Sequence, residues 1–229
     1  MKRTKKIITL AMAAVLLVST TVAVTVAYLQ SKTEVVTNTF TYGKVAITLD
    51  EAKVDLYGKE VVGADRVTAN KYKLIPNHTY VKDPTVHVVA DSEKSYIRMI
   101  VTINDLTDVK AAFGVAEDEY FLPQYFVEGW DNAIWKTTGF VDEDEQGDTA
   151  KYEFRYYKTV DTLDGQVEDL EPLFTKIKVP ASVANDALAK LGDLQIDIVA
   201  HAIQADGFVA TDDKTAEENA WAAFTDTQS

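Results

Sequence analysis

Strict alternation of side chains over residues 96–103 constrains the fold more than any other feature of this sequence. Every second position is apolar: Ile97, Met99, Val101 and Ile103. Successive side chains of a β-strand point to opposite faces, so these four residues share one face. The intervening positions include Ile100, which allows the opposite face to be covered as well. This stretch predicts a strand that carries a fully apolar face into the core.

Shorter apolar or alternating stretches predict further strands, and polar turns separate them. They lie at residues 45–49, 85–90, 130–136, 151–158, 175–179 and 194–204. Turns are predicted at Pro76-Asn77-His78 and at Asp83-Pro84, and an acidic turn at residues 142–148. Residues 50–70 are charged and weakly patterned, which predicts a loop or an insertion.

Helical patterns are few and short. One covers residues 105–113 and ends before Gly114, a good residue for a helix C-terminus. Another covers residues 182–191, with Ser182 as its N-cap. A third opens with a capping-box pattern from Thr215 to Glu218. Many short strands with a few helices predict a mainly β fold, a jelly-roll-like β-sandwich preceded by an N-terminal signal helix.

The N-terminus has the layout of a secretory signal. Four basic residues open the chain (Lys2, Arg3, Lys5 and Lys6), and residues 7–29 carry no charge. Thr25-Val26-Ala27 supplies small residues for cleavage, so we expect a signal peptide over residues 1–27 and a mature chain that begins at Tyr28. About 20 apolar residues can also span a bilayer. An uncleaved anchor is therefore the alternative, and the one way in which we expect membrane contact.

Charge and cysteine content exclude several classes of function. Residues 1–27 hold four of the 23 basic residues and none of the 36 acidic ones, so the mature chain has a net charge of −17. Such a charge repels nucleic acid and anionic lipid. The chain has no cysteine, which excludes disulfides, cysteine catalysis and zinc sites that need thiolates.

Several segments spread along the chain resemble one family of exported proteins. They are residues 26–29 (VAYL), 38–49 (NTFTYGKVAITL), 73–85 (KLIPNHTYVKDPT), 95–99 (SYIRM) and 202–207 (AIQADG), with Trp221 beyond. Together they resemble the TasA/camelysin group, whose signal peptides are cut by a SipW-type signal peptidase. Asn77 stands where glycine is commoner in the group.

The resemblance implies a secreted jelly-roll protein of a Gram-positive biofilm matrix that self-associates into fibres. Subunits of such fibres join by donor-strand exchange, in which the N-terminal segment of one subunit completes the sheet of another. Residues 28–42 are the corresponding segment here. The alternative is that they form the first strand of their own domain, residues 28–229, or a frayed tail.

The same group includes a protein described as a metallopeptidase. This sequence has no H-E-x-x-H motif, and its three histidines are scattered at His78, His87 and His201. We expect His78 in a turn and the other two in strands, and we expect no enzyme. A camelysin-like metallopeptidase stays the second alternative function.

One acidic segment nearly fits a calcium-binding loop. Its candidate ligands are Asp142, Asp144, Gln146, Asp148 and Glu153. Calcium takes six to eight oxygen ligands, but a calcium loop of this kind lies between helices, and a strand is predicted here. A solvated hairpin turn is the alternative.

Aromatic residues are dense between Tyr120 and Trp135. Rings on a surface can bind sugars or protein partners, whereas rings in a core serve packing. A cell-surface adhesin or binding module is therefore the first alternative to a matrix protein.

Overall fold

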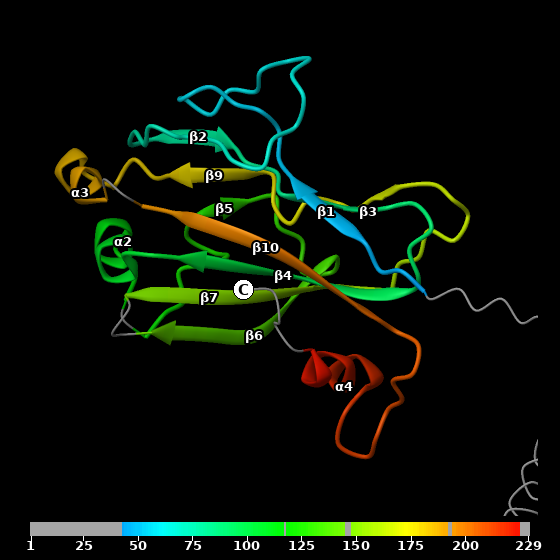
Figure 1. Cartoon of the computed structure of the whole chain (residues 1–229). Coiled ribbons are helices and arrows are strands. Elements are labelled where there is room, and N and C mark those ends of the chain that lie inside the picture. Colours follow the sequence, from blue (N-terminus) through cyan, green and yellow to red (C-terminus); the bar gives the residue numbers. More distant parts are fainter. Residues whose placement is uncertain (1–42, 117, 145–147, 192–193, 225–229) are drawn as a thin grey trace, which may run out of the picture. The chain divides into compact units, whose positions relative to one another are not determined.

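A four-stranded antiparallel sheet forms one layer of the protein in a computed structural model (Figure 1), which describes residues 43–116, 118–144, 148–191 and 194–224. Its strands are β10 (Ile196–Gln204), β4 (Ser95–Ile103), β7 (Thr149–Tyr156) and β6 (Trp135–Asp144), in that order. The predicted strand at residues 96–103 is confirmed. The strands predicted at residues 151–158 and 194–204 are also confirmed; both ends of the first and the start of the second are shifted by two residues.

Two three-stranded antiparallel sheets make up the rest of the β structure. One has the order β1 (Ile47–Asp50), β3 (Thr85–Val88) and β8 (Glu168–Asp169). The other has the order β2 (His78–Val81), β9 (Lys176–Val179) and β5 (Val127–Glu128). The sequence predicted β1, β3 and β9 approximately. It missed β2, β5 and β8, since two-residue strands and a strand that follows a turn directly carry no alternation.

The core lies between these sheets. Ile97, Met99 and Val101 on β4 are fully buried, and they belong to one cluster with Tyr80 of β2 and Val86 of β3. Three antiparallel sheets around one apolar cluster, with few short helices, are consistent with a β-sandwich. The mainly β class predicted from the sequence is thus confirmed.

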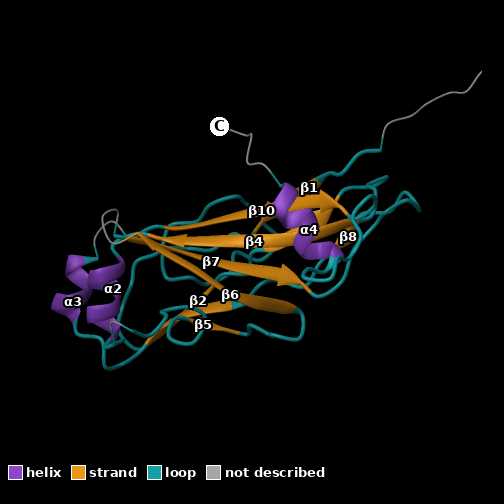
Figure 2. Cartoon of the chain, turned by 90° about the horizontal axis from the view of Figure 1, so that it is seen from below, coloured by secondary structure: helices purple, strands orange, loops and turns teal. Residues whose placement is uncertain are grey.

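The described part of the chain has three helices. Two of them, α2 (Leu106–Phe113) and α3 (Asn185–Lys190), lie together at one end of the sheets, and α4 (Ala216–Ala223) lies apart from them on the outer face of the four-stranded sheet (Figure 2). The predicted features of α2 and α4 are confirmed. Gly114 ends α2 with φ 69°, and Thr215 and Glu218 form both bonds of a capping box.

Three local predictions are wrong. The strand predicted at residues 130–136 begins only at Trp135, because the Trp135 N–H turns back to Asp131 O. That strand then continues to Asp144, into the predicted acidic turn, by pairing with β7. The helix predicted at residues 182–191 begins at Asn185, and its N-cap is Ala184, not Ser182. Val183 is instead buried in the core.

The segment predicted as a loop at residues 50–70 is indeed mostly irregular, but many contacts fix it. Isolated bridges join Glu51 to Val67 and Val54 to Glu60. Gly58 has φ 71°, and a Cβ there would lie 2.5 Å from Tyr80 Cβ. The backbone of Gly58 therefore packs directly on β2, where only glycine fits. This fixed loop forms one wall of the site described next.

Candidate functional site

The outer edge of β10 is the candidate functional site. In the part of the chain that the structure describes, no strand pairs with that edge. The Ala205 N–H donates to Lys94 O at 2.8 Å, and antiparallel pairs alternate between hydrogen-bonded and non-hydrogen-bonded ones. Odd-numbered residues of β10 therefore bond β4. Even-numbered residues, such as Ala200, turn their N–H and C=O groups to the open edge, which can pair with another chain.

The side chains of these even-numbered residues face the core but are only partly buried. They are Ile196, Ile198, Ala200 and Ala202. Their register partners on β4 are 0% exposed: Ile103, Val101, Met99 and Ile97. The core-facing side chains of β4 are thus fully covered, whereas those of β10 are still partly exposed. A strand added at this edge would cover the remaining apolar surface, which stabilises by about 25 cal/mol per Å².

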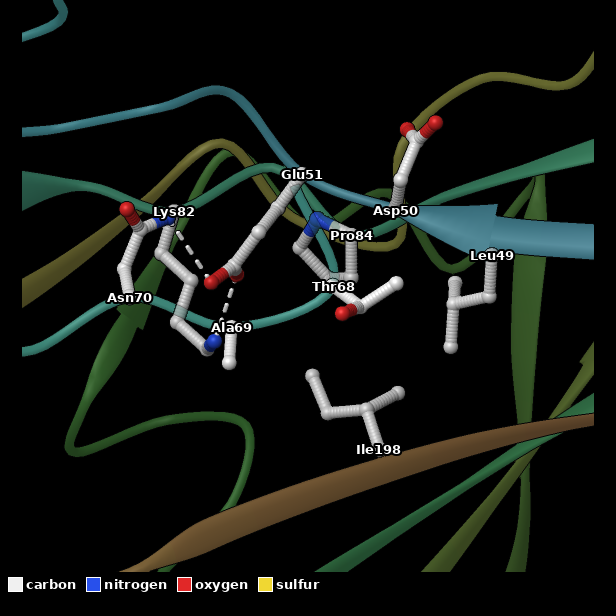
Figure 3. A pocket seen from close by; sticks show the side chains of 9 residues that line it. All are labelled: Leu49, Asp50, Glu51, Thr68, Ala69, Asn70, Lys82, Pro84 and Ile198. Carbon is white, nitrogen blue, oxygen red and sulfur yellow. Dashed lines mark hydrogen bonds and ion pairs between the residues drawn. The ribbon is translucent and has the colours of Figure 1, made fainter. Parts of the chain in front are cut away.

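A groove borders this edge, and its parts are two pockets that share Asn70 and Lys82. The first has a volume of about 200 Å³ and lies between Ile198 of β10 and Leu49, Glu51 and Thr68 opposite (Figure 3). The second has a volume of about 440 Å³. Its apolar lining comes from Tyr72, Leu74, Phe126, Ile177, Leu194 and Ile196. We call these two pockets the β10 groove.

A buried polar network lies in the wall of the β10 groove. Glu51 Oε2 accepts a hydrogen bond from Lys82 Nζ at 2.6 Å, and Glu51 Oε1 accepts one from Asn70 Nδ2 at 2.9 Å. The side chains of Glu51 and Lys82 are 7% and 10% exposed. Asn70 also bonds the backbone of Ala52 and Val54. These contacts hold the loop segment against the end of β1.

A second network lies on the opposite side of the same strand end, because Asp50 and Glu51 are neighbours and their side chains point apart. Arg66 Nε donates to Asp50 Oδ1 at 2.5 Å, and Arg66 also donates to Asp83 Oδ2 at 2.8 Å. His87 bonds two carboxylates, Asp50 at 2.9 Å through Nε2 and Asp169 at 2.6 Å through Nδ1. This network joins all three strands of the β1–β3–β8 sheet.

The pKa values in this second network follow from its hydrogen bonds. Burial by itself would lower the pKa of His87, but the bonds to Asp169 and Asp50 and their negative charge raise it above its usual value. Burial would raise the pKa of Asp50, but Arg66 and His87 lower it overall. Carboxylates only accept, so the two bonds are made together by the imidazolium form, in which both ring nitrogens of His87 donate. In that form the ring has no free nitrogen to act as a general base.

The structure places the three histidines on three different sheets. His87 lies on β3 and His201 on β10, as predicted, but His78 begins β2 and pairs with Val179, so the predicted turn position is wrong. The turn ends one residue earlier, at Asn77, which has φ 56°. Among the described residues, no group of three or more histidine, aspartate or glutamate side chains could hold a metal ion.

The candidate calcium ligands are spread over a hairpin. Asp142 and Asp144 lie on β6, and Gln146 lies outside the described residues. Asp148 Oδ1 accepts bonds from the N–H and hydroxyl of Thr107 at the start of α2. Glu153 accepts bonds from two arginines, Arg98 at 3.1 Å and Arg155 at 2.6 Å. Calcium binding here stays a prediction, and two of its five ligands already have other partners.

The aromatic segment mainly serves the core. Phe121, Phe126 and Trp135 are at most 2% exposed, and Tyr120 is 53% exposed. Three of the rings that could have lined a binding surface are therefore buried in the core.

Two N-terminal predictions lie outside the described residues. They are the signal peptide with its cleavage site between Ala27 and Tyr28, and the donor segment at residues 28–42. In the described ranges no helix is long and apolar enough to cross a membrane.

Sequence reasoning missed both polar networks. Glu51 and Lys82 are 31 positions apart, and Asp50 and His87 are 37 apart. No local spacing links such residues. The usable signal was a pair of adjacent carboxylates, Asp50 and Glu51, at the end of a predicted strand, since each needs a basic partner on its own face.

Fold and site together describe a mainly β protein with an open sheet edge beside a groove. Comparison with models of protein families, with curated proteins and with solved structures finds no match to this chain. The geometry of the β10 edge therefore carries the functional argument.

Proposed function

We propose that this chain is a secreted structural protein of an extracellular matrix that self-associates by strand addition. Residues 28–42 of one subunit pair with the open edge of β10 in another subunit and cover the apolar side chains that border the β10 groove. Repeated addition in one direction would produce fibres, because each subunit offers one donor segment and one acceptor edge. The observation that carries the proposal is the β10 edge, with which no described strand pairs, together with its incompletely covered core.

Export and fold details belong to the same proposal. A signal peptidase of the SipW type would cut after Ala27 and so release the donor segment, and only the uncut signal would contact the membrane. The sandwich would be a jelly roll, as the resemblance to the TasA/camelysin group implies. We propose no catalytic role and no binding of nucleic acid for the mature chain, whose negative charge is high.

Electron microscopy of the purified mature chain tests the proposal. We expect fibres from the parent chain and none from a variant that lacks residues 28–37, or from Val36→Pro, because proline cannot donate to a strand ladder. Val62→Pro is the matched control. It lies 90% exposed before Gly63, in a turn closed by the bond from Ala64 N–H to Val61 O, where proline is well accommodated. Fibres from the truncated chain would refute the proposal.

A further inference from the structure

The ammonium of Lys82 has more donors than the structure gives it acceptors. It carries three N–H bonds, and within the described residues its hydrogen-bond acceptor is Glu51 Oε2 at 2.6 Å. The face of Tyr72 also lies near it, with the ring centroid 5.7 Å from Nζ. Lys82 lines both pockets of the β10 groove. Two N–H bonds of a nearly buried cation therefore stay available to whatever enters.

The surroundings of Lys82 limit what can enter. Glu51 balances its charge, and burial together with the negative charge of Glu51 raises the pKa of Tyr72 so far that the phenol stays neutral. Asn70 is neutral and already bonded on both sides of its amide. An additional charged side chain would thus be desolvated beside a balanced pair, which is costly. Neutral oxygen acceptors, such as carbonyl and hydroxyl groups, would instead satisfy the two open N–H bonds.

We propose that Lys82 determines which segment the β10 groove accepts, by bonding neutral oxygen acceptors and rejecting cationic side chains. This inference rests on the proposed function and names the part of the donor segment that enters. Residues 35–42 (VVTNTFTY) are eight uncharged residues, whereas Lys32 and Glu34 precede them. Eight residues nearly match the nine-residue length of β10. Residues 35–42 therefore enter the groove and residues 28–34 stay outside it.

A peptide-binding experiment that compares an uncharged peptide with its lysine variants tests this inference. The protein is the full chain with Val36→Pro, which keeps its own segment from pairing. The probes are a fluorescent peptide of residues 35–42 and two variants of it, Thr37→Lys and Asn38→Lys. Adjacent residues of a strand face opposite sides, so one of the two lysines must point toward the groove. We expect that variant to bind at least tenfold more weakly than the parent peptide, measured by fluorescence anisotropy.

Substitutions at Lys82 should reverse this preference. In Lys82→Met the carboxylate of Glu51 has no cation beside it, so the rejected lysine peptide should bind better than the uncharged one. Glu51→Gln with Lys82→Met restores a neutral site and guards against misfolding, which thermal unfolding checks. There the repulsion by Lys82 is gone but the cost of desolvation remains, so the penalty on the lysine peptide should be smaller than in the parent and larger than in Lys82→Met.

Two failures are distinguishable. If the uncharged peptide binds but both Lys82 variants keep the parent's preference, Lys82 does not select and this inference alone falls. If the uncharged peptide does not bind the parent groove, strand addition by this segment is refuted and the proposed function falls with it.

Discussion

The two edges of the four-stranded sheet differ in whether their outward N–H groups have hydrogen-bond partners among the described residues. On β6, the Trp135 N–H donates to Asp131 O at 2.9 Å, and the Thr137 N–H donates to Asn132 Oδ1 at 3.2 Å. A register shift follows between Thr137 and Val141. On β10 the ladder to β4 runs without a shift over nine pairs, and the outward N–H groups of Ile198 and Ala200 have no described partner.

The charges along the two edges differ in the same sense. β6 ends in three consecutive acidic residues, Asp142 to Asp144, whereas β10 carries one carboxylate, Asp197. Bonds from a preceding turn, a bulge and like charges are the means by which proteins protect sheet edges from unwanted pairing. One edge of this sheet is thus protected against pairing, and the other is regular and apolar, which is what a specific strand-addition site requires.

The largest effect should come from closing the β10 edge. Ala200→Pro removes an outward N–H and no bond to β4. We expect loss of fibres, with at least a tenfold rise in the protein concentration needed for assembly, measured by light scattering. The free energy of unfolding should change by less than about 1 kcal/mol, because edge positions tolerate proline.

The neighbouring position is the control for this prediction. Val199→Pro removes a bond to β4 and leaves an acceptor unpaired, which should cost about 1–3 kcal/mol in stability. If Ala200→Pro still assembles like the parent, the β10 edge is not the acceptor.

An intermediate effect should come from removing the protection of β6. Asn132→Ala takes away the acceptor for the Thr137 N–H, and Asp142→Thr with Asp144→Thr removes two charges. In a chain that lacks residues 28–37, this triple variant should form dimers and larger species, which sedimentation velocity detects. A variant that stays monomeric would mean that the bulge alone protects this edge.

The smallest effect concerns the β1–β3–β8 sheet beside the groove. The raised pKa of His87 means that its contribution to stability is fully present below its unfolded pKa and is lost as pH rises through the folded pKa. His87→Gln should therefore destabilise by about 1–2 kcal/mol near pH 5, where the lowered pKa of Asp50 keeps that carboxylate available to the ring. The difference should shrink toward pH 9. Urea unfolding at both pH values measures it, and a difference that grows with pH would contradict the assignment.

Local patterns in the sequence were sufficient for the elements that depend on local chemistry. Alternation identified β4, because a fully buried face needs an apolar residue at every second position. Gly114 and the Thr215–Glu218 capping box marked helix ends, since caps depend on residues within one turn. Patterns failed where long-range contacts decide. Trp135 begins a strand because a preceding turn folds onto it, and β5 and β8 exist because they pair with β9 and β3.

By itself the sequence determined the mainly β class, the acidic surface and the central strand, since each follows from composition or from period-two alternation. Only the tertiary structure decided the site. Which strand lies at an edge depends on pairing, and a strand at an edge has the same alternation as one inside a sheet. Lys82 and Glu51 meet because the residue after β1 and the residue after β2 come together at the groove. Such contacts come from the three-dimensional arrangement of distant segments, and the adjacent carboxylates Asp50 and Glu51 indicate a need for basic partners without identifying them.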